Sequence, residues 1–118
     1  MPGRALCSGA ARRLMLEAAR VQWDEGMRRV DAERGDAARY RQLSTLVDAV
    51  ADELRRRVGQ TFTLSELATA YTGADDWARE TVLAATPSRS ARVGAADAAL
   101  VLDAAFGQYA RGASDYHP

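Results

Sequence analysis

Apolar residues recur along this chain at helical spacing, and the clearest run lies between Asp36 and Gly59. Asp36 is a favourable N-cap and Gly59 a favourable terminator. Arg55, Arg56 and Arg57 lie in the last turn, where positive charge suits the helix dipole. The apolar positions follow one another at spacings of 3, 4, 3, 4 and 4: Tyr40, Leu43, Val47, Val50, Leu54 and Val58. The run predicts an amphipathic helix of about five turns.

A second helical pattern precedes this one and begins at Ala11. Its apolar stripe has spacings of 7, 4 and 3: Leu16, Trp23, Met27 and Val30. Gly26 lies inside this helix and is expected to weaken or bend it, and Gly35 is the expected stop. The first ten residues include two glycines and a proline, so we expect residues 1–10 to form a flexible N-terminus.

The stretch from Gln60 to Val82 has the outline of a helix-turn-helix. Thr63 and Glu66 have the spacing of a capping box, and Phe62 is placed for a hydrophobic staple to Leu67. The first helix of the pair has one apolar face: Leu64, Leu67, Ala68 and Tyr71. The stretch therefore predicts a firmly folded junction in the middle of the chain.

Gly73 is expected to end that helix, and a second helix is expected over residues 76–85. Asp75 or Asp76 can cap it, and Thr86-Pro87 closes it. A loop is expected over 87–94 and a last helix over 95–111, with one apolar stripe: Ala99, Leu102, Phe106 and Tyr109. Residues 113–118 are expected to form a tail.

About five helices and a scarcity of β-branched residues predict an all-α fold. We expect one small bundle over residues 11–112, with a helix-turn-helix-like pair in its middle. The chain has 118 residues, and 47% of them are apolar, but 25 are alanine. The core is therefore thin, and its helices must approach closely to pack well.

The charges sum to zero but are unevenly spread along the chain. Residues 1–60 hold 12 Arg against 9 acids, and residues 61–118 hold 4 Arg against 7 acids. This asymmetry is too small to indicate general affinity for nucleic acid. It can orient a partner or a second copy of the chain.

The helix-turn-helix outline raises the alternative of a DNA-binding protein. Its second helix would enter the major groove, but it carries Asp75, Asp76 and Glu80 with Arg79 as the single base. Carboxylates that face phosphate are repulsive. No pair of strands follows to form a wing, so nucleic acid stays open as a partner but is disfavoured.

Two features could contact a protein partner. The run Arg55-Arg56-Arg57, with Arg39 and Arg41 earlier on the helix, could bind phosphate or an acidic partner, although consecutive residues point in three directions. The alternative is a solvated helix end that suits the dipole. Trp77 is either a core residue or an exposed interface anchor.

No residue pattern indicates catalysis or cofactor binding. Cys7 is the only cysteine and His117 the only histidine, so a multi-ligand zinc site is excluded. No glycine-rich phosphate loop is present. We therefore expect no enzyme activity, no cofactor and no metal. No apolar run approaches the length of a membrane span, so we expect no membrane association and a cytoplasmic location.

Two segments resemble small uncharacterised helical proteins of high-GC actinobacteria. They are Arg-Arg-Arg-Val-Gly-Gln-Thr-Phe-Thr-Leu-Ser-Glu-Leu-Ala and Ala-Phe-Gly-Gln-Tyr-Ala-Arg-Gly-Ala, and the resemblance covers about half of the chain. The absence of Lys, Ile and Asn, whose codons are AT-rich, agrees with such a genome. The resemblance implies a source and no activity.

The leading hypothesis is a non-enzymatic helical interaction module that docks on a larger cytosolic protein or self-associates as a homodimer. The alternative is a transcription-linked helix-turn-helix protein that binds DNA or the transcription machinery. The candidate partner-binding residues lie at the end of one helix and the start of another: Arg55, Arg56, Arg57, Asp75, Asp76, Trp77, Arg79 and Glu80.

Overall fold

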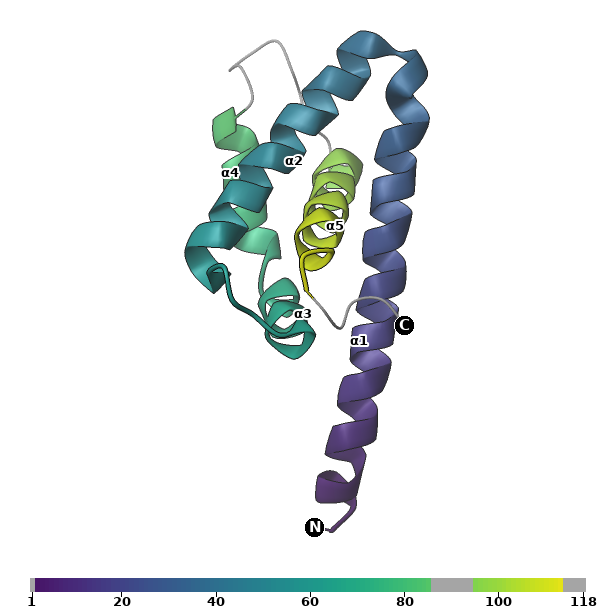
Figure 1. The fold of residues 1–118 in the computed structure, drawn as a ribbon, viewed down its shortest axis with the longest axis vertical. Coiled ribbons are helices and arrows are strands. Elements are labelled where there is room, and N and C mark those ends of the chain that lie inside the picture. Colours follow the sequence, from purple (N-terminus) through teal and green to yellow (C-terminus); the bar gives the residue numbers. More distant parts are fainter. Residues whose placement is uncertain (1, 86–94, 114–118) are drawn as a thin grey trace.

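The computed structural model describes residues 2–85 and 95–113, with side chains described for 14–85 and 96–113. These residues form five α-helices and one 3-10 turn, with no strand among them (Figure 1). The elements are α1 (Pro2–Asp31), η1 (Ala32–Gly35), α2 (Ala37–Val58), α3 (Leu64–Thr72), α4 (Asp75–Ala85) and α5 (Ala95–Ala110). The predicted all-α fold class is confirmed.

The helix α5 lies at the centre of the arrangement. The two long helices α1 and α2 form a hairpin through η1, and α5 lies between them (Figure 1). It contacts all four other helices, most extensively α1. The N-terminal end of α1 extends past the rest of the bundle (Figure 1), and the molecule measures 54 Å along its longest axis.

The first helix begins earlier than the hydrophobic pattern predicted. It starts at Pro2 instead of Ala11. Proline is well tolerated at the first helical position, since its missing N–H would have no partner there. Half of residues 3–10 are Ala, Leu or Arg, which are strong helix formers. The predicted flexibility of residues 1–10 stays a prediction.

The predicted boundaries of α2 are confirmed. The Asp36 side chain accepts a hydrogen bond of 3.2 Å from the backbone N–H of Arg39. At the other end Gly59 has a φ of +98°, a conformation that favours glycine, and its N–H donates to the Arg55 carbonyl. The Tyr109 hydroxyl donates to the Gly59 carbonyl, which ties this end to α5. The predicted apolar face points into the core, with its central positions buried: Leu43, Val47, Val50 and Leu54.

The capping box of α3 is also confirmed. Thr63 accepts from the N–H of Glu66 at 3.1 Å, and Glu66 accepts from the N–H of Thr63 at 2.8 Å. Phe62 stacks on Tyr109 with ring centroids 4.6 Å apart. This contact links the start of α3 to the end of α5.

The predicted N-cap of α4 is wrong. Asp75 and Asp76 lie inside its first turn, and the carbonyl of the buried residue Ala74 accepts the first helical hydrogen bond, from Ala78. The acidic side chains still suit the positive end of the helix dipole. Ala74 is fully buried, so the chain enters the core just before the expected cap, and the helix starts one residue earlier than predicted.

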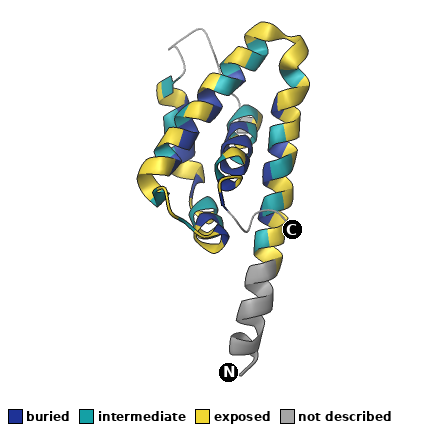
Figure 2. Cartoon of the chain, viewed as in Figure 1, coloured by how far each residue is buried: buried dark blue, intermediate teal, exposed yellow. Residues whose placement is uncertain are grey.

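The core centres on an aromatic cluster. Trp23 is fully buried, and its ring centroid lies 5.6 Å from that of Phe106, with the ring planes inclined by 29°. Tyr71 meets both rings edge-on, at 5.6 Å from Trp23 and 5.1 Å from Phe106. Figure 2 shows the buried faces of the helices turned toward α5. The cluster therefore joins α1, α3 and α5 at one point.

Gly26 makes the close approach of α1 and α5 possible, and the weakening or bending of the helix predicted at this position stays a prediction. A Cβ at Gly26 would lie 2.6 Å from the Cβ of Asp103 and 2.8 Å from the backbone N of Ala104. A Cβ at Gly107 would lie 3.0 Å from the Trp23 carbonyl oxygen. The two helices thus touch backbone to backbone, as the alanine-rich composition requires.

The ends of α5 differ from the predicted stripe. Ala99 is exposed, whereas Ala113, assigned to the tail, is buried in the core. Because α5 is surrounded by helices, positions outside its predicted stripe are buried as well: Val101, Ala104, Ala105 and Ala110. The predicted loop at 87–94 and the other tail residues, 114–118, lie outside the described residues.

The methyl group added in Gly26→Ala meets backbone atoms that cannot move independently, a clash that costs about 1–3 kcal/mol. The gain in helix propensity offsets about 1 kcal/mol of this cost, so we expect a net destabilisation of up to about 2 kcal/mol. Chemical denaturation measures the difference. Gly73→Ala is the control, since a Cβ there would meet no atom within 4 Å. Equal stability of the two variants would contradict the close approach.

Candidate functional site

The three arginines at the end of α2 bond to acids on their own helix. All three are exposed, and Arg55 pairs with Asp52. Arg56 and Arg57 both bond to Glu53 at 2.8 Å, and hydrogen bonds, first from Arg56 and then from Arg57, hold the pKa of Glu53 below its ordinary value. The run is therefore partly neutralised and is not a compact phosphate-binding fork.

Arg57 and Trp77 connect α2 to α4. The guanidinium carbon of Arg57 lies 4.7 Å from the centre of the Trp77 ring, a cation–π geometry. Trp77 is half-buried, and its ring lies 6.4 Å from Phe106. It packs against the edge of the core, which agrees with the core alternative for this residue.

The other candidate residues of α4 face solvent. The four side chains are exposed: Asp75, Asp76, Arg79 and Glu80. The structure thus brings Arg57 and Trp77 together and leaves the acidic face of α4 uncovered. The assignment of these residues to partner binding stays a prediction.

Arg39 has an intramolecular role instead of a phosphate-binding one. It donates two hydrogen bonds, of 2.9 and 2.7 Å, to the two carboxylate oxygens of Asp97 on α5. The Arg39 hydrogen bond lowers the pKa of Asp97, and the same bond raises the pKa of Arg39. This half-buried pair fastens α2 to the first turn of α5.

A polar junction lies beside the aromatic cluster. The Tyr71 hydroxyl is 2.6 Å from an oxygen of Asp103 and 3.1 Å from the amide oxygen of Gln22. Burial raises the pKa of the Asp103 carboxyl, and the charge of Asp75 raises it further, against the lowering effects of Tyr71 and Arg29. Burial and the bond to Asp103 raise the pKa of Tyr71. The junction holds α1, α3 and α5 together.

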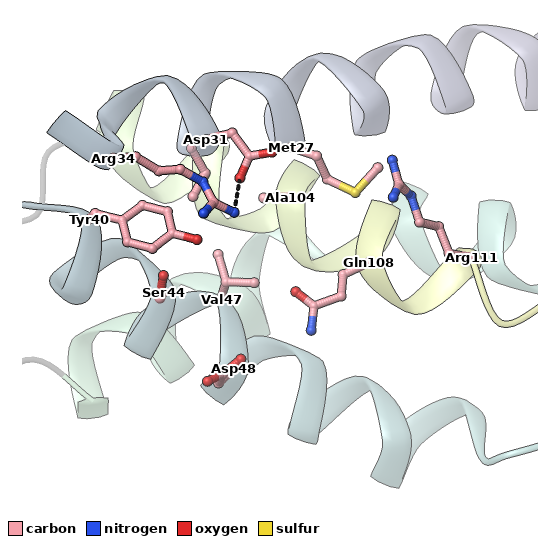
Figure 3. Close-up of a pocket in the computed structure, with 11 residues that line it drawn as sticks. Met27, Asp31, Arg34, Tyr40, Ser44, Val47, Asp48, Ala104, Gln108 and Arg111 are labelled. Atoms are coloured by element: carbon pink, nitrogen blue, oxygen red, sulfur yellow. Dashed lines mark hydrogen bonds and ion pairs between the residues drawn. The ribbon is translucent and has the colours of Figure 1, made fainter.

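A cleft of about 380 Å³ opens between α1, α2 and α5 (Figure 3). Its lining includes Met27 and Val47, with Arg34 and Arg111 toward opposite ends. Arg34 bonds to Asp31 at 3.4 Å and lies 5.1 Å from the centre of the Tyr40 ring. Two arginines and two aspartates, Asp31 and Asp48, line the cleft, so its formal charges balance and favour neither an anion nor a cation.

Most of the large apolar side chains that are exposed lie on α1. Among the described side chains Leu14, Met15 and Val21 of α1 are 70%, 58% and 65% exposed, and Leu83 of α4 is 61% exposed. Leu14, Ala18 and Val21 follow at spacings of 4 and 3, so they form one stripe, which we call the outer face of α1. The spacing of this stripe is present in the sequence, but its exposure is seen only in the structure.

A shallow groove flanks the outer face. It has a volume of about 240 Å³ and lies between α1 and α3. Met15 and Leu16 line one side, and Ala68 and Thr69 are among the residues on the other. Apolar surface therefore continues around α1 from its outer face toward α3.

By its fold, this chain is a small all-α bundle, and its long helix α1 is partly uncovered. No protein-family model, curated protein or solved structure matches the chain. Within residues 2–85 and 95–113, no helix has the length and apolar character needed to cross a membrane. The same residues contain no group of three or more His, Cys, Asp or Glu placed to hold a metal ion.

We expect Asp103→Asn to be more stable than the wild type at pH 7. The raised pKa means that the folded state favours the neutral carboxyl, so its charged form lowers stability at neutral pH. As pH falls through the raised pKa, Asp103 becomes protonated and the wild type regains this stability. The stability advantage of Asp103→Asn should therefore shrink over the same pH interval. Thermal unfolding from pH 7 to pH 4 measures the difference.

Tyr71→Phe is the companion variant for this test. It keeps the ring but removes the hydrogen bond to Asp103, so we expect a loss of about 1 kcal/mol at pH 7. A pH-independent difference between Asp103→Asn and the wild type would contradict the assigned cause of the shift.

Proposed function

We propose that this chain is a non-enzymatic protein-interaction module that binds its partner through the outer face of α1. The observation that carries the proposal is the exposure of Leu14 and Val21 on one stripe. Burying a large apolar side chain stabilises a complex by about 1.5–3 kcal/mol. Grouped exposed apolar residues are typical of interaction sites, whereas scattered ones are not.

The position of α1 supports the same function. One side of α1 packs on α5 through Trp23 and Gly26, and the N-terminal end of the helix extends past the bundle (Figure 1). A helix that serves only the fold would carry polar residues on its other side. The partly uncovered helix is therefore accessible to another chain.

The charged residues give less support to a DNA-binding role. Several arginines bond within the molecule, among them Arg39 and Arg57. The exposed face of α4 carries Asp75, Asp76 and Glu80. These carboxylates would repel the phosphates of a duplex approached by that helix. We therefore favour a protein partner, in the cytoplasm, over nucleic acid.

Site-specific photo-crosslinking in the native cell tests this function. We expect p-benzoyl-L-phenylalanine at Val21 to give a covalent adduct with another polypeptide chain, because a bound partner would cover that position. The matched control places the same residue at Leu83, which is similarly exposed but lies on α4. No adduct from position 21, or the same adducts from both positions, would contradict the proposal.

A further inference from the structure

The outer face of α1 lies opposite the core. Leu14 and Trp23 are nine residues apart, which is two and a half helical turns, so they point to opposite sides. Trp23 is fully buried, whereas Leu14 is the most exposed of the large apolar residues described. A chain bound to the outer face would thus leave the contact between α1 and α5 undisturbed.

The spacing on the outer face matches the seam of a helix pair. Leu14, Ala18 and Val21 alternate by 4 and 3, the pattern with which two helices pack side by side. The small Ala18 between two larger residues allows close approach. In the sequence the same spacing continues backward to Ala11 and Cys7. The pattern ends at Glu25, where the next position is an exposed acid.

The charges along α1 are self-complementary when two copies run in opposite directions. Residues 2–16 carry three Arg and no acid, whereas residues 17–25 carry three acids and one Arg. Glu17 and Glu25 bond to Arg20 and Arg28 of their own helix, but such exposed pairs are weak, so these acids keep part of their attraction for a second helix. In an antiparallel pair that crosses near Leu14, the basic stretch of each helix lies beside the acidic stretch of the other. In a parallel pair the like charges would lie together, which is repulsive. Antiparallel helix dipoles add to the preference.

We infer that the outer face of α1 binds the same face of a second copy, so that two α1 helices pack antiparallel about a two-fold axis near Leu14. This inference rests on the proposed function and names its partner. The contact is isologous, since the same residues meet from both sides. Each bundle lies on the far side of its own α1, where Trp23 and Gly26 hold it, so the two bundles do not collide.

Sedimentation equilibrium over a range of protein concentrations tests the dimer. We expect the wild type to show a reversible monomer–dimer equilibrium. Leu14→Glu places a charge in the seam of both copies, so it should raise the dissociation constant by about 100-fold or more. Val21→Glu should act in the same direction. Leu83→Glu, a matched change at an exposed apolar residue of α4, should leave the constant unchanged.

Thermal unfolding of each variant checks the fold, which we expect to be retained because all three positions are exposed. A wild type that stays monomeric at every concentration overturns the inference. A dimer that Leu83→Glu disrupts and Leu14→Glu leaves intact overturns it as well.

The distance between two spin labels tests the direction of the helices. A nitroxide is attached at Arg28→Cys in a Cys7→Ser background, so that each chain carries one label. Residue 28 lies 14 positions beyond Leu14, so the labels in an antiparallel pair should be about 40 Å apart. A distance under about 20 Å would indicate parallel helices and would overturn the inferred arrangement.

The two proposals can fail separately. If the adduct from position 21 contains a different protein and the purified chain is monomeric, the second-copy inference fails while the interaction module stands. If position 21 gives no adduct and the chain is monomeric, both fail. An adduct with the mass of two copies of the chain, together with the sedimentation result, supports both.

Discussion

The close packing of α1 on α5 is the constraint on which the rest of the structure depends. At Gly26 the two backbones approach so closely that a single added methyl group would lie 2.6 Å from the Asp103 Cβ. Beside this point Trp23 and Phe106 stack in the core. A chain with few large apolar residues gains its packing by such contact, because dispersion attraction falls quickly with distance. The position of α1 also decides which of its sides faces solvent.

The polar contacts fasten the other helices around this pair. Arg39 and Asp97 join α2 to α5, Tyr71 and Asp103 join α3 to α5, and Arg57 covers Trp77 between α2 and α4. These contacts involve charged residues that the sequence suggested as contacts for a partner, among them Arg39 and Arg57. None of these contacts involves the apolar outer face of α1. We therefore propose the binding site on this face and not at the arginine run.

Local signals in the sequence predicted much of the fold. The caps at Asp36 and Thr63 and the end at Gly59 depend on a few neighbouring residues, so the sequence is sufficient to find them. The buried face of α2 was found because its periodicity is unbroken. The start of α1 at Pro2 was missed, since glycine and proline near the terminus suggested a break.

Contacts between distant segments could not be predicted in the same way. Periodicity shows which side of a helix is apolar, but not which neighbour covers it. For this reason the sequence does not reveal the close approach at Gly26, and it predicts one buried stripe on α5, although that helix is surrounded. The same ambiguity hid the outer face of α1: only the structure shows that Leu14 and Val21 lie away from the core. The pairing of the arginine run with Asp52 and Glu53, one turn away, is likewise seen only in the structure.

The central claim is that one side of α1 packs on the core and the other side binds a second copy of the chain. Amide hydrogen exchange at low and high protein concentration tests it most directly, since a covered helix opens less often. The account predicts that amides of residues 14–22 become more protected as concentration rises, while those of 75–85 do not change. Equal protection of residues 14–22 at both concentrations, or a change confined to 75–85, would contradict it.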